Sequence, residues 1–286
     1  MRRINEHTDQ QGFLTIAQNG SADYLSMAYV QAMSIKLTMP GSKYAVVVDN
    51  ATDALLTEEH RQVFDYVIKL DEDYAKDQRW KLGNEWQVFW LTPFKETIKL
   101  EADILIPRSI SHWWNTFRLR DVVLSLGCRN YKDELSNSKK YRELFVDNYL
   151  PDVYNGLMYF RYSQTAANYF SVAREIFLNW GEVAKELTKV SDEMATTDVA
   201  YALACKIIGP ELTTIPTADF INFIHMKPGI NDWPEGNEFH KSVNLVVDPP
   251  RIRVNNIEQY HPFHYHYKDF ITSEIIEKYQ NALRLA

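Results

Sequence analysis

Two short motifs that lie far apart in the chain carry residue types that could hold a metal ion beside a diphosphate group. The first is Glu101-Ala102-Asp103, at the end of the strand-like run 97–100. The second is His225-Met226-Lys227-Pro228-Gly229, which follows the largely apolar run 221–224. Carboxylates and imidazoles bind Mn²⁺ and Mg²⁺, and a lysine ammonium neutralises phosphate charge. Together the motifs predict metal-assisted chemistry on a substrate that carries a diphosphate.

The first half of the chain alternates between apolar runs and helical patterns. Strands are expected over 13–17, 44–48, 66–70 and 97–106, and helices over 22–39, 58–64 and 84–92. This alternation predicts an α/β fold with a mostly parallel central sheet that is covered by helices. Ligands collect at the carboxyl ends of the strands in such sheets. Asn19, Asp49 and Asp103 all follow such ends.

The second half of the chain is less regular. A strand is expected within 154–162, helices over 165–179 and 197–208, and loops with short strands after Gly229. We find neither an internal repeat nor a linker in the sequence. The expected organisation is therefore a single domain over residues 1–286.

The composition is that of an ordinary globular protein. Of the 286 residues, 45% are hydrophobic and 24% are charged, and no run approaches the roughly 18 apolar residues of a membrane span. The opening residues 1–6 carry no apolar stretch, so we expect no signal peptide, a cytoplasmic location and no membrane partner. Cys128 and Cys205 lack CxxC spacing, which fits a reducing compartment and argues against thiolate metal sites.

The acidic motif also has an ordinary structural explanation. On a regular strand Glu101 and Asp103 would face the same side, where their charges repel unless a cation or protons compensate. Such acid pairs are common, however, and Glu101 could be a solvated edge residue with Asp103 as a turn cap. The distant His225 and Lys227 favour the metal interpretation, because an imidazole and an ammonium would complete the same site.

The order of these motifs resembles that of the glycogenin-type retaining glycosyltransferases, which have a single-domain GT-A fold. The resemblance covers roughly residues 12–235. The stretch Asn84-Glu85-Trp86-Gln87 and the compressed second motif look most like the enzymes encoded by T-even-like bacteriophages. The family's metal motif is matched by residues 101–103, where Glu101 replaces the usual first aspartate. Its Asn-Gly strand is matched by Asn155-Gly156, and its Asp-Gln pair by Asp198-Val199.

The resemblance implies a metal-dependent transferase that uses a nucleotide sugar, with UDP as the expected nucleotide, and Mn²⁺ or Mg²⁺. Residues 1–106 would form a nucleotide-binding half, and residues 107–286 an acceptor-binding half that completes the metal and diphosphate site. Glu101, Asp103 and His225 would hold the metal. Asp198, Asn155 and Lys227 would act in catalysis, Lys227 on the departing diphosphate. Donor binding would involve Ala17, Asn19, Tyr24, Asn84, Glu101, Ala102, Asp103, Gly156, His225, Lys227 and Gly229.

The segment 107–142 is the most individual part of the sequence. It holds eight basic and three acidic residues, a local charge of +5 in a chain with a net charge of −7. A solvated basic helix face explains this segment as well as a surface for a polyanionic acceptor does. On the second interpretation the acceptor is bound by Trp113, Trp114, Arg118, Arg120 and Arg129.

The leading hypothesis for the acceptor is the hydroxymethyl group of a modified cytosine in phage DNA. The alternatives are a hydroxyl of a glycan or a protein, or a catalytically silent protein that binds a nucleotide sugar or DNA. A further run holds His261, His264 and His266. His264 and His266 would share one strand face, but no acidic ligand follows at a recognisable spacing. A structural, aromatic-rich segment is therefore the favoured interpretation of this run.

Overall fold

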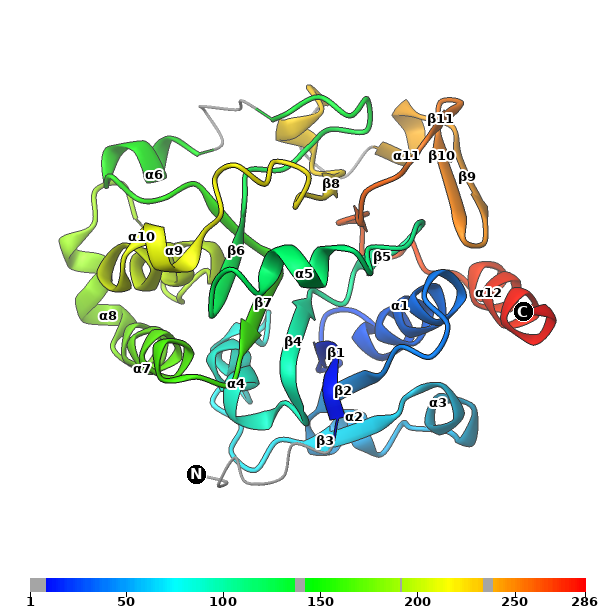
Figure 1. The fold of residues 1–286 in the computed structure, drawn as a ribbon, viewed down its shortest axis with the longest axis horizontal. Helices are drawn as coiled ribbons and strands as arrows, with labels where there is room; N and C mark the ends of the chain where they lie inside the picture. Colours follow the sequence, from blue (N-terminus) through cyan, green and yellow to red (C-terminus); the bar gives the residue numbers. More distant parts are fainter. Residues whose placement is uncertain (1–8, 137–141, 191, 234–238) are drawn as a thin grey trace.

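The computed structural model describes residues 9–136, 142–190, 192–233 and 239–286 (Figure 1). The opening residues 1–6, and Lys139, Lys140 and Tyr141 of the basic segment, lie outside these ranges. Within the described ranges, no helix is both long and apolar enough to cross a lipid bilayer.

A six-stranded sheet forms the centre of the molecule (Figure 1). Its strands are β1 Asp9–Ala17, β2 Tyr44–Val48, β3 Tyr66–Lys69, β4 Phe94–Leu100, β6 Val122–Leu126 and β7 Val153–Arg161, in the order β3-β2-β1-β4-β7-β6. Strands β1 to β4 are parallel, and β7 runs antiparallel between β4 and β6. The predicted α/β fold with a mostly parallel sheet is confirmed.

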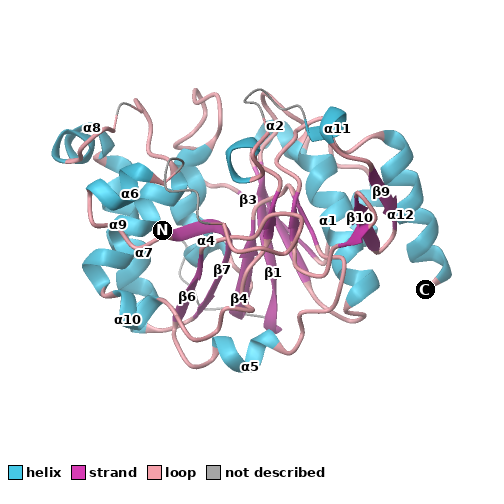
Figure 2. Cartoon of the chain, turned by 90° about the horizontal axis from the view of Figure 1, so that it is seen from above, coloured by secondary structure: helices cyan, strands magenta, loops and turns pink. Residues whose placement is uncertain are grey.

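Helices pack on both faces of this sheet (Figures 1 and 2). The α-helices are α1 Tyr24–Thr38, α2 Asn50–Asp53, α3 Glu58–Val63, α4 Val88–Leu91, α5 Trp113–Phe117, α6 Glu143–Asp147, α7 Gln164–Leu178, α8 Trp180–Val183, α9 Thr197–Ile208, α10 Pro210–Thr213, α11 Phe239–Ser242 and α12 Ser273–Leu285. Short 3₁₀ helices span Leu82–Gln87, Ala184–Glu186 and Pro228–Ile230.

The alternation of side chains along the strands divides the apolar residues into two cores. Phe13 and Val46 point to the face covered by α1 and α12, whereas their neighbours Leu14 and Val47 point to the face covered by α7 and α9. Successive side chains of a strand point to opposite faces, so a strand buried on both faces must be apolar throughout. The run Tyr44–Val48 is apolar at every position and buried at every position.

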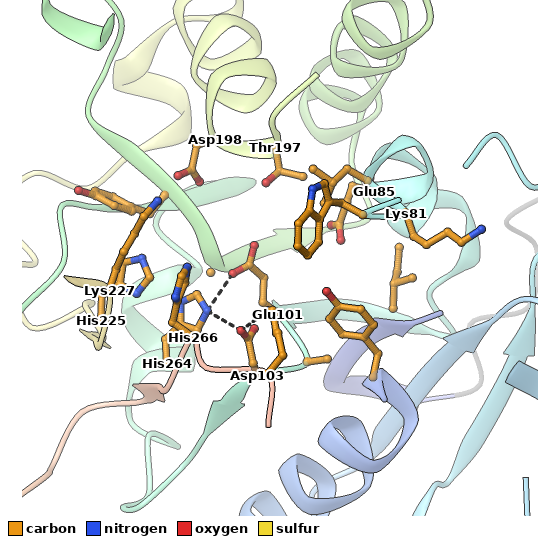
Figure 3. Close-up of a pocket in the computed structure, with 18 of the residues that line it drawn as sticks. Lys81, Glu85, Glu101, Asp103, Thr197, Asp198, His225, Lys227, His264 and His266 are labelled. Carbon is orange, nitrogen blue, oxygen red and sulfur yellow. Dashed lines mark hydrogen bonds and ion pairs between the residues drawn. The ribbon is translucent and has the colours of Figure 1, made fainter. Parts of the chain in front are cut away.

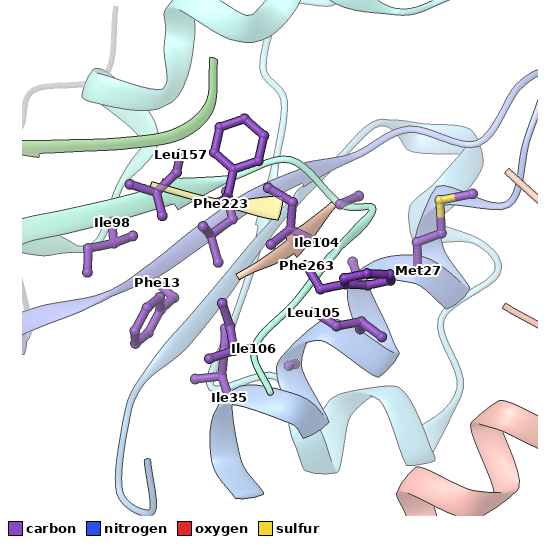
Figure 4. Packing of buried hydrophobic residues seen from close by; sticks show 14 of the residues in the cluster. Phe13, Met27, Ile35, Ile98, Ile104, Leu105, Ile106, Leu157, Phe223 and Phe263 are labelled. Atoms are coloured by element: carbon purple, nitrogen blue, oxygen red, sulfur yellow. The ribbon is translucent and has the colours of Figure 1, made fainter. Parts of the chain in front are cut away.

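A second, small sheet joins three segments that are distant in the sequence. It consists of β5 Ile104–Leu105, β12 Phe263–His264 and β8 Ile224–His225, with β12 in the middle. Strand β12 runs antiparallel to β5 and parallel to β8. Figure 4 shows the side chains of Ile104, Leu105 and Phe263 from this sheet, with the neighbouring Phe223, in the hydrophobic core. A further antiparallel sheet holds β9 Leu245–Asp248, β10 Arg251–Val254 and β11 Ile257–Glu258.

Three elements differ from the sequence-based expectations. The expected strand 97–106 is interrupted by a turn at residues 101–103 and continues as β5 in the small sheet. The expected helix 84–92 is a 3₁₀ turn followed by the short helix α4. The end of the chain, expected to hold only loops and short strands, contains helix α12, which packs on α1 through Tyr279.

Candidate functional site

A cavity of about 570 Å³ lies at the carboxyl ends of β1 and β4 (Figure 3). It is lined by Ile16, Gln18, Tyr24, Trp80, Lys81, Leu82, Glu85, Glu101, Ala102, Asp103, Tyr154, Gly156, Thr197, Asp198, Phe223, His225, Lys227, His264, His266 and Lys268. This edge is where ligands bind in open α/β sheets. The cavity joins the ends of the central strands to the small sheet, which brings both sequence motifs together.

The acidic motif is held in place by hydrogen bonds from other elements. Gln31, on α1, donates from Nε2 to the carbonyls of Glu101 at 2.6 Å and Ile104 at 2.8 Å. The amide of Glu101 donates to the carbonyl of Gly156 on β7 at 3.1 Å, and Tyr265 N donates to Asp103 O at 3.2 Å. The turn is therefore fixed between α1, β7 and the segment after β12.

Three side chains in the described ranges form a group that could hold a metal ion. One ligand atom from each of Glu101, Asp103 and His264 lies within 4.8 Å of the others. His264 Nε2 is 3.0 Å from Asp103 Oδ2 and 3.5 Å from Glu101 Oε2 (Figure 3). Asp103 and His264 are buried. Two carboxylates and one imidazole are a donor set that suits Mn²⁺, and the carboxylates also suit Mg²⁺.

His225, which the sequence assigned to the metal, lies directly beside this group. Its ring stacks on that of His264, with centroids 4.4 Å apart and planes 6° apart. The stacking follows from the register of the small sheet, in which His264 on β12 pairs with His225 on β8. His225 Nδ1 is buried and has no hydrogen-bond partner among the described residues.

The electrostatic environment shifts the pKa values of the two carboxylates in opposite directions. Burial opposes ionisation of Asp103, but His264 and Lys268 outweigh it and hold the pKa of this carboxyl well below its usual range. Burial raises the pKa of Glu101, with a smaller opposing effect from His264. Burial, reinforced by His264, also holds the pKa of His225 well below its usual range. His225 is therefore neutral near pH 7, the form in which imidazole binds metals.

One end of the cavity carries the residues expected to bind the nucleotide. Tyr24 and Gln18 line it. Asn84, which is fully buried, donates to Gln18 Oε1 at 2.8 Å and therefore supports this side chain from behind. Asn19 accepts a hydrogen bond from Leu25 N at 2.8 Å and so fixes the start of α1. Ala17 is buried in the core.

The opposite end holds the residues expected to act in catalysis. Asp198 lines the cavity, and its carboxylate accepts from Asn155 N at 2.7 Å and from Arg142 Nη1 at 3.1 Å. Asn155 is fully buried and donates from Nδ2 to Glu101 Oε1 at 3.2 Å. Lys227 lines the cavity, and burial lowers the pKa of its ammonium. Gly156 also lines it, and an added Cβ would lie 3.0 Å from the ring of Phe223.

Several side chains at the cavity were not anticipated from the sequence. Lys99 is fully buried, and its Nζ lies 2.6 Å from Glu85 Oε2 and 3.1 Å from Asn155 Oδ1. A lysine between the apolar residues Ile98 and Leu100 of β4 is a signal that could have suggested this buried ion pair. His264 and Lys268 reach the site only because β12 pairs with β5, which no local pattern reveals. Gly229, by contrast, is not among the described residues that line the cavity.

The structure does not bring the five expected acceptor-binding residues to this cavity. Trp113 and Trp114 are core side chains, and the ring of Trp114 packs on Phe13 at 5.8 Å. Arg118 bonds to Glu96 and Gln11, near the amino ends of β4 and β1. That edge of the sheet is opposite to the cavity.

The two remaining arginines of that set have local partners. Arg120 Nε donates to the carbonyl of Glu211 at 2.8 Å. The backbone of Arg129 adjoins β8, and its side chain pairs with Asp133 at 3.3 Å. Residues 107–136 of the basic segment thus pack as part of the fold.

Comparisons with known proteins give a similarity at the level of structure. No protein-family model matches the chain, and no curated protein matches its sequence. The solved structure of an active-site mutant of LgtC superposes with a TM-score of 0.51 and 13% identity, over 97% of this chain and 96% of that one. The apo glycosyltransferase GlyE of Streptococcus pneumoniae TIGR4 gives a TM-score of 0.51 and 7% identity, over 96% of this chain and 60% of GlyE. The chain therefore has the GT-A type of α/β fold.

Proposed function

We propose that this protein is a glycosyltransferase that moves a sugar from a nucleotide sugar to an acceptor hydroxyl with the help of a divalent metal. UDP is the expected nucleotide. The observation that carries the proposal is the group Glu101, Asp103 and His264, which opens into the cavity that Lys227 and Lys268 also line. This combination suits a metal-bound diphosphate, and it occurs in a chain with the fold of solved glycosyltransferases.

Glu101, Asp103 and His264 would hold Mn²⁺ or Mg²⁺, with His225 stacked behind His264. When bound, the ion would act as a Lewis acid on the diphosphate oxygens. Lys227 would place an ammonium beside the negative charge that develops as the glycosidic bond breaks. Because this charge appears in the transition state, such contacts accelerate the chemical step rather than merely tightening substrate binding.

Asp198 would position the sugar or stabilise the positive charge on its anomeric carbon. Two fixed donors, Asn155 N and Arg142, hold its carboxylate at the cavity wall. Such a group costs no reorganisation during the reaction. We propose net retention at the anomeric carbon, since the resemblance is to retaining enzymes and no general base was evident in the sequence. Proton NMR of the product linkage tests this, and an inverted linkage would refute it.

Hydroxymethylated DNA of phage type is retained as the acceptor hypothesis, with a glycan or protein hydroxyl as the alternative. Its support is the +5 charge of segment 107–142 in the sequence. The burial of Trp113 and Trp114 counts against base stacking by these rings. A competition assay that offers hydroxymethylated and unmodified DNA with one donor would distinguish a base hydroxyl from other acceptors.

The most economical test of the function is a panel of nucleotide sugars incubated with the purified protein and Mn²⁺. Release of free nucleotide identifies the donor even when the acceptor is unknown, because water can accept the sugar slowly. We expect release from one nucleotide class, and its loss in Asp103→Asn. Asp248→Asn is a matched control, since this carboxylate lies on β9 and pairs with Arg251 away from the cavity lining. No release from any donor would contradict the proposal.

A further inference from the structure

Lys268, which belongs to neither sequence motif, contacts the candidate metal site. Its Nζ lies 2.6 Å from Asp103 Oδ2, the same oxygen that lies 3.0 Å from His264 Nε2. The Lys268 side chain is 31% exposed, and its ammonium lies 5.3 Å from the centroid of the Tyr24 ring. A carboxylate that would bind the metal therefore already has an ammonium counter-ion.

An ammonium and a divalent cation at one carboxylate repel each other. At a separation of a few ångströms in a partly buried site this repulsion is strong, and a dication doubles it relative to a single charge. The lysine side chain is a flexible four-carbon stem, and its partial exposure leaves the ammonium room to move. A metal at Asp103 therefore favours departure of the Lys268 ammonium from that carboxylate.

Among the described residues that line the cavity, the other carboxylates are already engaged, Glu101 as the second carboxylate that would hold the metal. Glu85 is already paired with Lys99 at 2.6 Å, and Asp198 with Arg142 at 3.1 Å. Lys268 and Tyr24 both line the cavity, so the ammonium stays within reach of whatever enters it. A donor diphosphate brings new negative charge into this space, and lysine is a common partner of phosphate.

We propose that Lys268 is a positioning residue that couples metal binding to donor binding. In the metal-free protein its ammonium holds Asp103, and when metal binds it moves from Asp103 to the diphosphate of the donor. The inference rests on the proposed function, because it requires a metal and a nucleotide in the same cavity. Linkage then requires that each ligand raises the affinity for the other by the same factor.

Calorimetric titration of Mn²⁺, with and without UDP, tests this exchange. Lys268→Met removes the ammonium and keeps the length of the stem, so Mn²⁺ alone should bind on the order of tenfold more tightly than to the wild type. UDP should raise the Mn²⁺ affinity of the wild type about tenfold and that of the variant clearly less. The Mn²⁺–UDP equilibrium is measured separately and subtracted.

Three further variants separate charge from packing. Lys268→Arg keeps the charge and should bind Mn²⁺ like the wild type. Lys81→Met removes an ammonium from the same cavity that contacts the backbone carbonyls of Ala75 and Lys76, so it should also bind Mn²⁺ like the wild type. Lys268→Gln serves as a second uncharged variant, and circular dichroism verifies that each variant is folded.

The possible results distinguish between the exchange, the coupling and the proposed function. Equal Mn²⁺ affinity of the wild type and the uncharged Lys268 variants, measured without UDP, would overturn the exchange. An equal effect of UDP on all of them would overturn the coupling. A site that binds no Mn²⁺ in any variant would contradict the proposed function itself, and this inference with it.

Discussion

At the scale of single residues, most of the carboxylates that line the cavity are held in place by specific partners. Asp198 has Arg142 and the amide of Asn155, and Asp103 has Lys268 and His264. The exception is Glu101, whose side chain is 26% exposed and whose contacts are longer, 3.2 Å to Asn155 and 3.5 Å to His264. Glu101 is therefore the ligand with most freedom to adjust to an ion.

Residue types alone predicted some of the side chains that line the cavity. Glu101, Asp103, His225 and Lys227 line one cavity, as the spacing of the two motifs led us to expect. His264 was interpreted as structural, because no acid follows it at a ligand spacing. Its carboxylate neighbours instead precede it by some 160 positions in the sequence, and only the pairing of β12 with β5 brings them together.

The two stacked histidines should contribute unequally to metal binding. We predict that His264→Ala lowers Mn²⁺ affinity about a hundredfold or more, because it removes one of three clustered ligands. His225→Ala should lower it only about tenfold, the size of effect typical for a residue that supports a ligand. Mn²⁺ titration of both variants measures this, with the exposed His112→Ala as the control. A larger loss in His225→Ala would show that His225 is the ligand.

The buried pair of Lys99 and Glu85 should be costly to break from one side. Lys99→Met leaves Glu85, whose side chain is 12% exposed, without its ammonium partner. We predict a loss of about 3–5 kcal/mol in the free energy of unfolding. The double variant Lys99→Met with Glu85→Gln should recover part of it, since the uncompensated charge is gone. Urea unfolding of the wild type, Lys99→Met, Glu85→Gln and the double variant measures these effects, and strictly additive effects would contradict a direct pair.

At the scale of elements, the turn after β4 is what positions the acidic motif. The sequence predicted one strand over 97–106, because residues on both sides of the motif are apolar. In the structure β4 ends at Leu100 and β5 begins at Ile104, so the chain leaves the central sheet for the small one. Strand pairings of two residues leave no periodic signal, which is why the pairing of β5, β8 and β12 into one sheet could not be predicted.

Helix α12 is a different case, because its sequence does contain the signal. Thr272 caps it, accepting from Ile275 N, and Ile275, Ile276, Tyr279 and Leu283 recur at helical spacing. These positions pack toward α1. Only loops and short strands were expected after Gly229, so this helix was not predicted although its pattern was present.

Gln31 on α1 should be needed to hold the turn at residues 101–103 in its conformation. Its Nε2 donates to the carbonyls of Glu101 and Ile104, and its Oε1 accepts from Tyr44 Oη at 2.8 Å. Gln31→Leu leaves these buried groups unpaired, which costs about 1–3 kcal/mol for each group that water cannot reach. We predict lower stability together with weaker Mn²⁺ binding. Gln280→Leu, on α12, is the control, and an unchanged Mn²⁺ affinity in Gln31→Leu would contradict the account.

At the scale of the whole molecule, different parts of the protein lie on the two faces and at the two ends of the central sheet. Apolar cores fill both faces, the cavity takes the carboxyl edge, and α5 closes the amino edge, as Figure 2 shows. The fold class followed from the sequence because apolar strands alternate with helices. The placement of segment 107–142 did not, since its charge and aromatic content suit a solvated helix, a binding surface or a packed connection equally well.

The histidines also link the stability of the whole protein to pH. Burial, reinforced by His264, lowers the pKa of His266 to about 3 and holds that of His225 well below its usual range. The unfolded chain takes up protons on both residues near pH 6.5, and the folded protein does not. Without metal, the free energy of unfolding should therefore fall as the pH drops below about 6.5.

Each neutral histidine contributes at most about 1.4 kcal/mol per pH unit to this slope. Urea unfolding in a chelating buffer between pH 7.5 and 4.5 measures it. In His266→Gln the slope should be shallower by up to one such increment, because one of the protonation sites is absent. Stability that does not change between pH 7 and pH 5 would contradict the burial of neutral histidines.

The central claim is that Glu101, Asp103 and His264 hold a divalent metal against the diphosphate of a nucleotide. Crystals grown with Mn²⁺ and UDP, measured at the manganese absorption edge, test it most directly. The account predicts one anomalous peak within about 2.4 Å of oxygens of Glu101 and Asp103 and of His264 Nε2, with the nucleotide beside it in the cavity. Manganese at another position, or a nucleotide bound outside the cavity, would contradict it.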